Sequence, residues 1–115
     1  MKDIRALKRR HLIYYLDVFN NENDELLGKL VDITTRGIKL VSRLPIAIDI
    51  DFLLRLTFPE GYFRSRDLTF EARSIWSSND VNPDFYDTGF EVINLDREGR
   101  KVIRRLIDLV GFNDT

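Results

Sequence analysis

The sequence predicts a mainly β protein, a six-stranded antiparallel barrel followed by one C-terminal α-helix. Short segments of alternating, β-branched and aromatic residues recur along the chain, and turn residues end most of them. Only the last segment repeats its apolar residues with a helical period. With 115 residues, of which 43% are hydrophobic, the chain is long enough and apolar enough for one compact core.

Three strands are expected within the first 42 residues. The first begins at Leu12 and is stopped by Asn20-Asn21. The sequence ELLGKLVDI, residues 25–33, is its return strand in a hairpin. After the tight turn TTRG, the sequence IKLVS forms a third strand whose residues Ile38, Leu40 and Ser42 share one face.

Three more strands follow Pro45, and they are predicted from IDIDFLLRLTF (48–58), DLTFEARSIW (67–76) and TGFEVINL (88–95). A Pro-Glu-Gly turn and a loop rich in Asn, Asp and Pro separate them. Six short strands in so small a domain favour a closed or nearly closed antiparallel barrel. Phe70, Trp76 and Phe90 are expected to be core aromatic residues.

The sequence DREGRKVIRRLIDLVG, residues 96–111, predicts an amphipathic helix that covers one open side of the barrel. Asp96 is placed to cap its first turn and Gly111 to end it. The apolar stripe consists of Val102, Ile103, Leu106, Ile107 and Val110. The cations of this helix are expected to form a solvated face, and a partner site there stays open; they are Arg100, Lys101, Arg104 and Arg105.

The residues needed for catalysis or metal binding are scarce. The chain has one histidine, His11, and no cysteine, which excludes a disulfide, a thiolate nucleophile and a cysteine-ligated zinc. No catalytic triad order, glycine-rich phosphate loop or metal-ligand spacing occurs. Asp49 and Asp51 are two residues apart and are predicted to lie on a solvated strand face. We therefore expect no enzyme activity, no catalytic residues, no metal and no cofactor.

Localisation is predicted from the same composition. The absence of cysteine fits a reducing compartment. The N-terminal sequence MKDIRALKRR has no apolar region of signal-peptide length, and no segment approaches the roughly 20 apolar residues of a membrane span. We expect a cytoplasmic protein without membrane insertion.

Positive charge is concentrated at the N-terminus, although the formal net charge is only −1. This distribution predicts a flexible basic arm over residues 1–11, followed by a single domain over residues 12–111. Within the arm, Arg5 and Arg9 have R-x-x-x-R spacing, and Arg10 follows directly. Residues 32–37 read DITTRG, a D-x-T-x-x-G pattern in the turn between the second and third strands.

The arm and the turn, in this order and at this interval, resemble the PilZ family of cytoplasmic bacterial receptors for cyclic di-GMP. The two signatures of that family are an R-x-x-x-R arm and a [D/N]-x-S-x-x-G turn. The resemblance runs from Arg5 to Leu109 and includes the GFEVINLD sequence before the helix. It implies a six-stranded barrel with a C-terminal helix. Thr34 stands where the family usually has serine, and Ile4 precedes Arg5 where an arginine doublet is more common.

The resemblance also implies a ligand-binding set, which consists of Arg5, Arg9, Arg10, Asp32, Thr34 and Gly37. Arginine can pair with phosphate oxygens or with guanine O6 and N7 and can stack on a base. Asp32 can accept from guanine N1–H and N2–H, and Thr34 offers a hydroxyl to phosphate or base. Gly37 leaves space where the turn bends or a ligand approaches. Arg9 and Arg10 compete for the role of second motif arginine.

Three functions are compatible with these observations. The leading one is a cyclic di-GMP receptor in second-messenger signalling, whose arm closes over the ligand and changes a surface that a downstream protein reads. The alternative is a PilZ-like adaptor that binds no nucleotide and contacts motility or polysaccharide machinery, as in biofilm formation. The third, a barrel that binds single-stranded nucleic acid, is disfavoured because the chain is nearly neutral and its positive charge is local. The ligand stoichiometry, the oligomeric state and the partner stay open.

Overall fold

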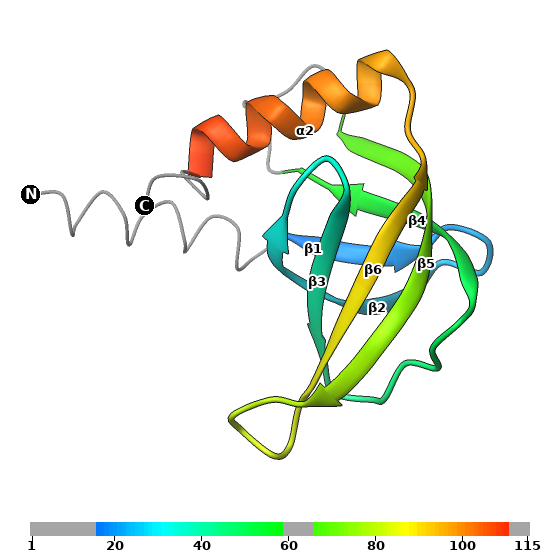
Figure 1. The fold of residues 1–115 in the computed structure, drawn as a ribbon, viewed down its shortest axis with the longest axis vertical. Helices are drawn as coiled ribbons and strands as arrows, with labels where there is room; N and C mark the ends of the chain where they lie inside the picture. The colour runs from blue at the N-terminus through cyan, green and yellow to red at the C-terminus, as the bar shows by residue number, and fades with distance from the viewer. Residues whose placement is uncertain (1–15, 59–65, 111–115) are drawn as a thin grey trace, which may run out of the picture.

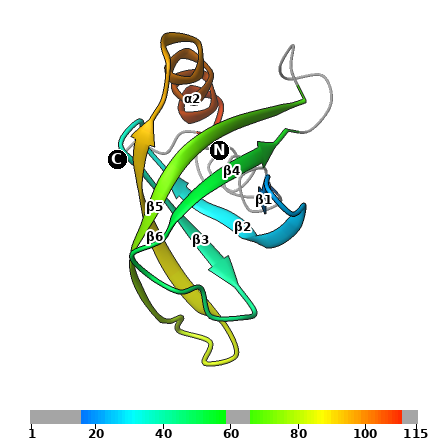
Figure 2. The ribbon, with the colours of Figure 1, turned by 90° about the vertical axis from the view of Figure 1, so that its right-hand side faces the viewer.

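A computed structural model describes residues 16–58 and 66–110, and these form a closed antiparallel β-barrel with a C-terminal helix. The strand order around the barrel is β1-β2-β3-β6-β5-β4, and pairing of β1 with β4 closes it. Helix α2 lies across one end of the barrel, and the loop that joins β5 to β6 lies at the other end (Figures 1 and 2). The predicted fold class is confirmed.

The bounds of the elements are β1 Asp17–Asn20, β2 Glu25–Ile33, β3 Gly37–Ser42, β4 Asp51–Thr57, β5 Asp67–Asn79, β6 Tyr86–Asn94 and α2 Arg97–Val110. All six predicted strands are present. Several features of the prediction lie outside the described residues: the basic arm over residues 1–11 with His11, the start of the first strand at Leu12, the Pro59-Glu60-Gly61 turn, and Gly111.

Strand β4 begins three residues later than the sequence pattern predicts. Asp49 has a φ of 62°, a left-handed conformation that interrupts an extended strand. The segment before β4 is instead fastened to the buried Ser74 of β5, whose hydroxyl donates to the carbonyl oxygen of Ala47 at 2.7 Å. The same hydroxyl accepts from the backbone N–H of Ile50 at 3.2 Å. Asp49 therefore lies outside the strand, while Asp51 begins it.

The barrel interior is filled by side chains from all six strands and from α2. The predicted shared face of Ile38, Leu40 and Ser42 in β3 is confirmed, and it points inward, because all three residues are buried. Phe70 and Phe90 are also buried, as predicted. The prediction for the third aromatic residue was wrong: Trp76 is 42% exposed. An irregularity in the β5–β6 pairing between Ser74 and Trp76 inserts one residue, and this places the Trp76 side chain on the outer surface.

Helix α2 begins at the predicted cap. The Asp96 carboxylate accepts from the backbone N–H of Gly99 at 2.7 Å, which satisfies a free donor of the first turn. Ile103, Leu106 and Ile107 are buried and belong to the same hydrophobic cluster as the strand residues. Helix α2 thus covers one end of the barrel, as predicted (Figure 1). The charged residues of α2 are exposed.

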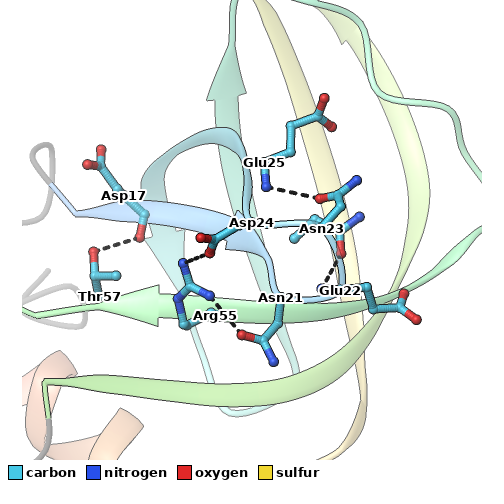
Figure 3. A network of polar contacts seen from close by, with 9 residues as sticks. Asp17, Asn21, Glu22, Asn23, Asp24, Glu25, Arg55 and Thr57 are labelled. Carbon is cyan, nitrogen blue, oxygen red and sulfur yellow. Dashed lines mark hydrogen bonds and ion pairs between the residues drawn. The ribbon is translucent and has the colours of Figure 1, made fainter.

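The acidic turn between β1 and β2 is held by an arginine from β4. Arg55 donates through Nη1 to the side-chain oxygen of Asn21 at 2.8 Å and through Nη2 to the Asp24 carboxylate at 2.5 Å (Figure 3). Its guanidinium also lies 4.8 Å from the centre of the Phe19 ring. Asp24 has a φ of 64°, which a short polar residue tolerates in a turn. These contacts order a turn that would otherwise carry unpaired negative charge.

No helix in the described part of the chain is long and apolar enough to span a membrane. Residues 16–58 and 66–110 also contain no group of three or more His, Cys, Asp or Glu side chains arranged to hold a metal ion.

Candidate ligand site at the β2–β3 turn

The D-x-T-x-x-G motif forms the turn between β2 and β3, and Thr34 organises it. The Thr34 hydroxyl accepts from the backbone N–H groups of Arg36 and Gly37, both at 3.1 Å. Its oxygen also lies 3.4 Å from the carbonyl oxygen of Gly37, to which it donates. The backbone N–H of Thr34 donates to the same carbonyl at 2.8 Å. The hydroxyl is therefore already engaged in forming the turn.

Asp32 points to the outside of the barrel because β2 contains a bulge. Leu30 and Ile33 are both fully buried although they are three residues apart, which strict alternation does not allow. The β2–β3 register shifts between Leu30 and Asp32, so Val31 is the extra residue. One Asp32 oxygen accepts from the backbone N–H of Ile33 at 2.9 Å. The second has no hydrogen-bond partner in the described part of the chain and is exposed.

Gly37 is required by the neighbouring strand. A β-carbon at this position would lie 2.7 Å from the backbone oxygen of Phe90 in β6. The turn is tied to the same strand, because the Val92 N–H donates to the carbonyl oxygen of Arg36 at 2.8 Å. Arg36 itself has an exposed side chain. Gly37 thus allows close approach of β6 to the turn.

Four residues lie in one row across the outer surface of the barrel. Asp32 of β2 is in register with Lys39 of β3, Lys39 with Gly89 of β6, and Gly89 with Trp76 of β5. Neighbouring strands are about 4.8 Å apart, so the row spans roughly 14 Å. Lys39 lies between the buried Ile38 and Leu40 and therefore faces outward.

The Trp76 side chain forms the β5 end of the row. A β-carbon on Gly89 would meet the Trp76 indole nitrogen at 2.1 Å, so the indole lies directly against the glycine backbone. Because Trp76 is 42% exposed, part of the ring is open to solvent. A carboxylate, an ammonium group and an aromatic ring are thus aligned on one face.

Charged neighbours flank this row. Asp51 accepts from Arg73 Nε at 2.7 Å and from Nη2 at 3.3 Å, and these hydrogen bonds lower the pKa of Asp51. On the other side, burial raises the pKa of Asp87, and the hydrogen bond and negative charge of Asp80 raise it further. The positive charge of Lys39 acts in the opposite direction on Asp87. Arg73 forms an ion pair with Asp51, whereas Lys39 is the register neighbour of Asp32 on the adjacent strand.

The structure brings together three of the six predicted site residues. Asp32, Thr34 and Gly37 occupy one turn, while Arg5, Arg9 and Arg10 lie outside the described residues. Lys39 and Trp76 were not predicted as site residues. The alternation of β3 is the signal that would have placed Lys39 on the outer face. For Trp76 the available signal was its polar neighbourhood, SIWSS, which is unusual for a buried strand.

Comparison with known proteins agrees with this fold. The PilZ domain model matches residues 5–109, and this chain belongs to the PilZ domain family. PilZ domains are receptor or adaptor domains without enzymatic activity, so the prediction that this chain is not an enzyme is confirmed by its family. Comparison with curated protein sequences gave no match.

Solved structures share the fold at low sequence identity. The Bacillus subtilis inhibitor of motility MotI/DgrA has a TM-score of 0.65 at 19% identity, over 84% of this chain. The PilZ domain of Escherichia coli YcgR with cyclic di-GMP has a TM-score of 0.64 at 14% identity, over 84% of this chain and 81% of that one. The Borreliella burgdorferi PlzA protein in complex with cyclic di-GMP has a TM-score of 0.54 at 13% identity, over 96% of this chain. The match spans 45% of the MotI/DgrA chain and 50% of the PlzA chain.

Proposed function

We propose that this domain is a cyclic di-GMP receptor whose binding surface is the row from Asp32 to Trp76, completed by arginines of the N-terminal arm. The observation that carries the proposal is the second Asp32 oxygen, which has no hydrogen-bond partner among residues 16–58 and 66–110, on an exposed side chain that the β2 bulge turns outward beside Lys39. Two structurally similar PilZ proteins, YcgR and PlzA, are known in complex with cyclic di-GMP, which supports this ligand class.

Each group of the row suits one part of the ligand. The free Asp32 oxygen can accept from guanine N1–H or N2–H. The Lys39 ammonium can pair with a phosphate, and the exposed Trp76 ring offers a face on which a base can stack. Thr34 and Gly37 contribute by holding the turn against β6, so that Asp32 keeps its position.

The arm supplies the remaining charge. Arg5, with Arg9 or Arg10, pairs with the phosphates or with guanine O6 and N7. Fixing about six backbone residues costs roughly 6 to 12 kcal/mol, while each charge-assisted hydrogen bond contributes on the order of 1.5 to 3 kcal/mol. Several such bonds are needed to offset the ordering. Closure of residues 1–11 over the ligand would then change the surface presented to a downstream protein.

Calorimetric titration of the full chain with cyclic di-GMP, with GMP as the control ligand, tests the proposal. We expect saturable binding of cyclic di-GMP that is absent for GMP, and the titration gives the stoichiometry. Trp76 is the only tryptophan, so its fluorescence reports stacking independently. Absence of both heat and a thermal shift at high ligand concentration would refute the receptor function.

Alanine variants identify the contacts. Asp32→Ala is expected to weaken binding about 10-fold or more with little change in stability, because its side chain is exposed. Arg5→Ala should have a comparable effect, and only one of Arg9→Ala and Arg10→Ala should match it, which decides the second motif arginine. The matched controls are Asp84→Ala and Arg43→Ala, which remove the same charges from exposed sites near the opposite end of the barrel.

The second candidate is a nucleotide-independent adaptor. It is favoured by the structural similarity to a protein described as an inhibitor of motility, MotI/DgrA. In this case Asp32→Ala and the arginine variants leave partner binding unchanged, and no variant responds to cyclic di-GMP. We propose for either function that the downstream partner is motility or polysaccharide machinery.

A further inference from the structure

The solvent-facing side of α2 carries an excess of positive charge. Seven charged residues of the helix are exposed, and five of them are cations. These five define the basic face of α2: Arg97, Arg100, Lys101, Arg104 and Arg105. With Glu98 and Asp108 the helix has a net charge of +3, in a chain whose formal net charge is −1.

The stability of the helix does not explain this arrangement. Arg97 occupies the first helical position, close to the positive end of the helix dipole, where a cation is unfavourable. Arg100 stands three residues from Arg97 and four from Arg104, so like charges adjoin along the helix. One ion pair on α2 joins Lys101 Nζ to Glu98 at 3.7 Å. The like charges along Arg97, Arg100 and Arg104 are not what helix stability favours, and this points to a role outside the helix.

The spacing of the cations forms a straight stripe. Arg97, Arg100 and Arg104 follow i, i+3, i+7, so they lie on one side of the helix over about 10 Å of its length. These three side chains have no carboxylate partner in the described part of the chain and are exposed. This stripe of α2 cations is therefore available to a partner.

We propose that the basic face of α2 docks an acidic helix of a partner protein, with carboxylates at i, i+3 or i+4, and i+7. Guanidinium groups at this spacing can pair with carboxylates on a facing helix, and charge complementarity of this kind speeds association and excludes wrong partners. The surface is formed by residues of α2 and includes no residue of the Asp32 row, so the inference does not depend on nucleotide binding.

A protein partner fits better than a membrane or a nucleic acid. Helices that adsorb to membranes insert an apolar face, but Ile103, Leu106 and Ile107 of α2 are buried in the barrel core. The exposed side of α2 also carries two carboxylates beside the basic face, Glu98 near one end and Asp108 near the other. They would repel a continuous polyanion but can pair with cations of a mixed protein surface.

The test uses the full chain and a fluorescent helical peptide that carries glutamates at i, i+3 and i+7, followed by anisotropy. A peptide of the same composition with scrambled glutamate positions is the ligand control. We expect binding that weakens as salt increases. The double variant Arg100→Glu/Arg104→Glu should weaken it at least about 10-fold. Arg43→Glu changes the charge of an exposed cation away from α2 and should leave affinity within about twofold.

Several results would overturn the inference. These are equal affinity of the double variant and the wild type, equal binding of the scrambled peptide, or binding only to phosphatidylglycerol vesicles or duplex DNA. Helical circular dichroism and thermal unfolding verify that the variants are folded. The neutral variant Arg100→Gln/Arg104→Gln, expected to weaken binding by a smaller factor, separates loss of attraction from introduced repulsion.

Discussion

The backbone oxygen of Phe90 lies 2.7 Å from the position that a β-carbon would occupy on Gly37. Real β-carbons essentially never approach a backbone atom so closely, so strand β6 or the turn has to shift when this glycine is replaced. The last residue of the D-x-T-x-x-G turn is therefore explained by strand packing, and a ligand is not needed to account for it.

Gly37→Ala is expected to destabilise the fold by about 1 to 3 kcal/mol, because the atom it meets belongs to the backbone and cannot rotate away. Urea unfolding measures the change. Arg36→Ala, in the same turn but with an exposed side chain, should change stability by less than about 0.5 kcal/mol. Equal stabilities of Gly37→Ala and the wild type would show that β6 moves freely at this point.

Thr34→Val keeps the shape of the side chain but removes the acceptor of two backbone N–H groups. We expect a loss of about 0.5 to 1.5 kcal/mol, since the turn is exposed and water can replace part of the interaction. Thr34→Ser keeps the hydroxyl and should be close to the wild type. If Thr34→Val lowers cyclic di-GMP affinity without any loss of stability, the hydroxyl contacts the ligand directly and its role in the turn is secondary.

Gly89→Ala should displace the indole of Trp76, because the new β-carbon would lie 2.1 Å from Trp76 Nε1. The ring is already partly exposed and can swing outward, so we expect only about 1 kcal/mol of destabilisation. Tryptophan emission should shift to longer wavelength as the ring becomes more hydrated. Ser78→Ala, on the same strand, serves as the control, and an unchanged emission spectrum in Gly89→Ala would contradict the packing of the ring on the glycine.

The pair formed by Asp80 and Asp87 makes stability depend on pH. Burial and the neighbouring Asp80 raise the pKa of Asp87 above its ordinary value of 3.8, so the folded state favours the protonated form. Stability associated with this group is present at acid pH and is lost as pH rises through the raised pKa.

Asp87→Asn removes this effect and should stabilise the protein at pH 7, by less than about 1 kcal/mol because both side chains are still partly open to solvent, which screens the charges. The gain should shrink as pH falls through the raised pKa and vanish below 3.8. Urea unfolding at several pH values measures it, with Asp84→Asn as the matched control. A gain that persists at low pH would exclude the proposed charge effect.

Much of this structure could be predicted from local patterns. Alternating apolar residues and turn residues predicted six strands, and the helical period after Asp96 predicted α2 with its cap. The interior positions of β3 and the stripe of α2 followed from the same periods of two and 3.6 residues. The D-x-T-x-x-G turn was located at the correct junction.

What could not be predicted depends on contacts between distant strands. The bulge at Val31 turns Asp32 outward, and the irregularity before Trp76 brings that ring onto Gly89 of β6. Register shifts such as these are set by how neighbouring strands fit together around the closed barrel, and a simple alternation rule does not contain them.

The sequence by itself therefore determined the number and type of elements, the family resemblance, and three residues of the turn, since these depend on side chains close together in the chain. Only the tertiary structure decided that Thr34 and Gly37 shape the turn, and that Asp32, Lys39 and Trp76 share one face. The physical reason is that closure of the barrel places β2, β3, β6 and β5 side by side, and the identity of a residue's neighbours across strands is a property of that closure.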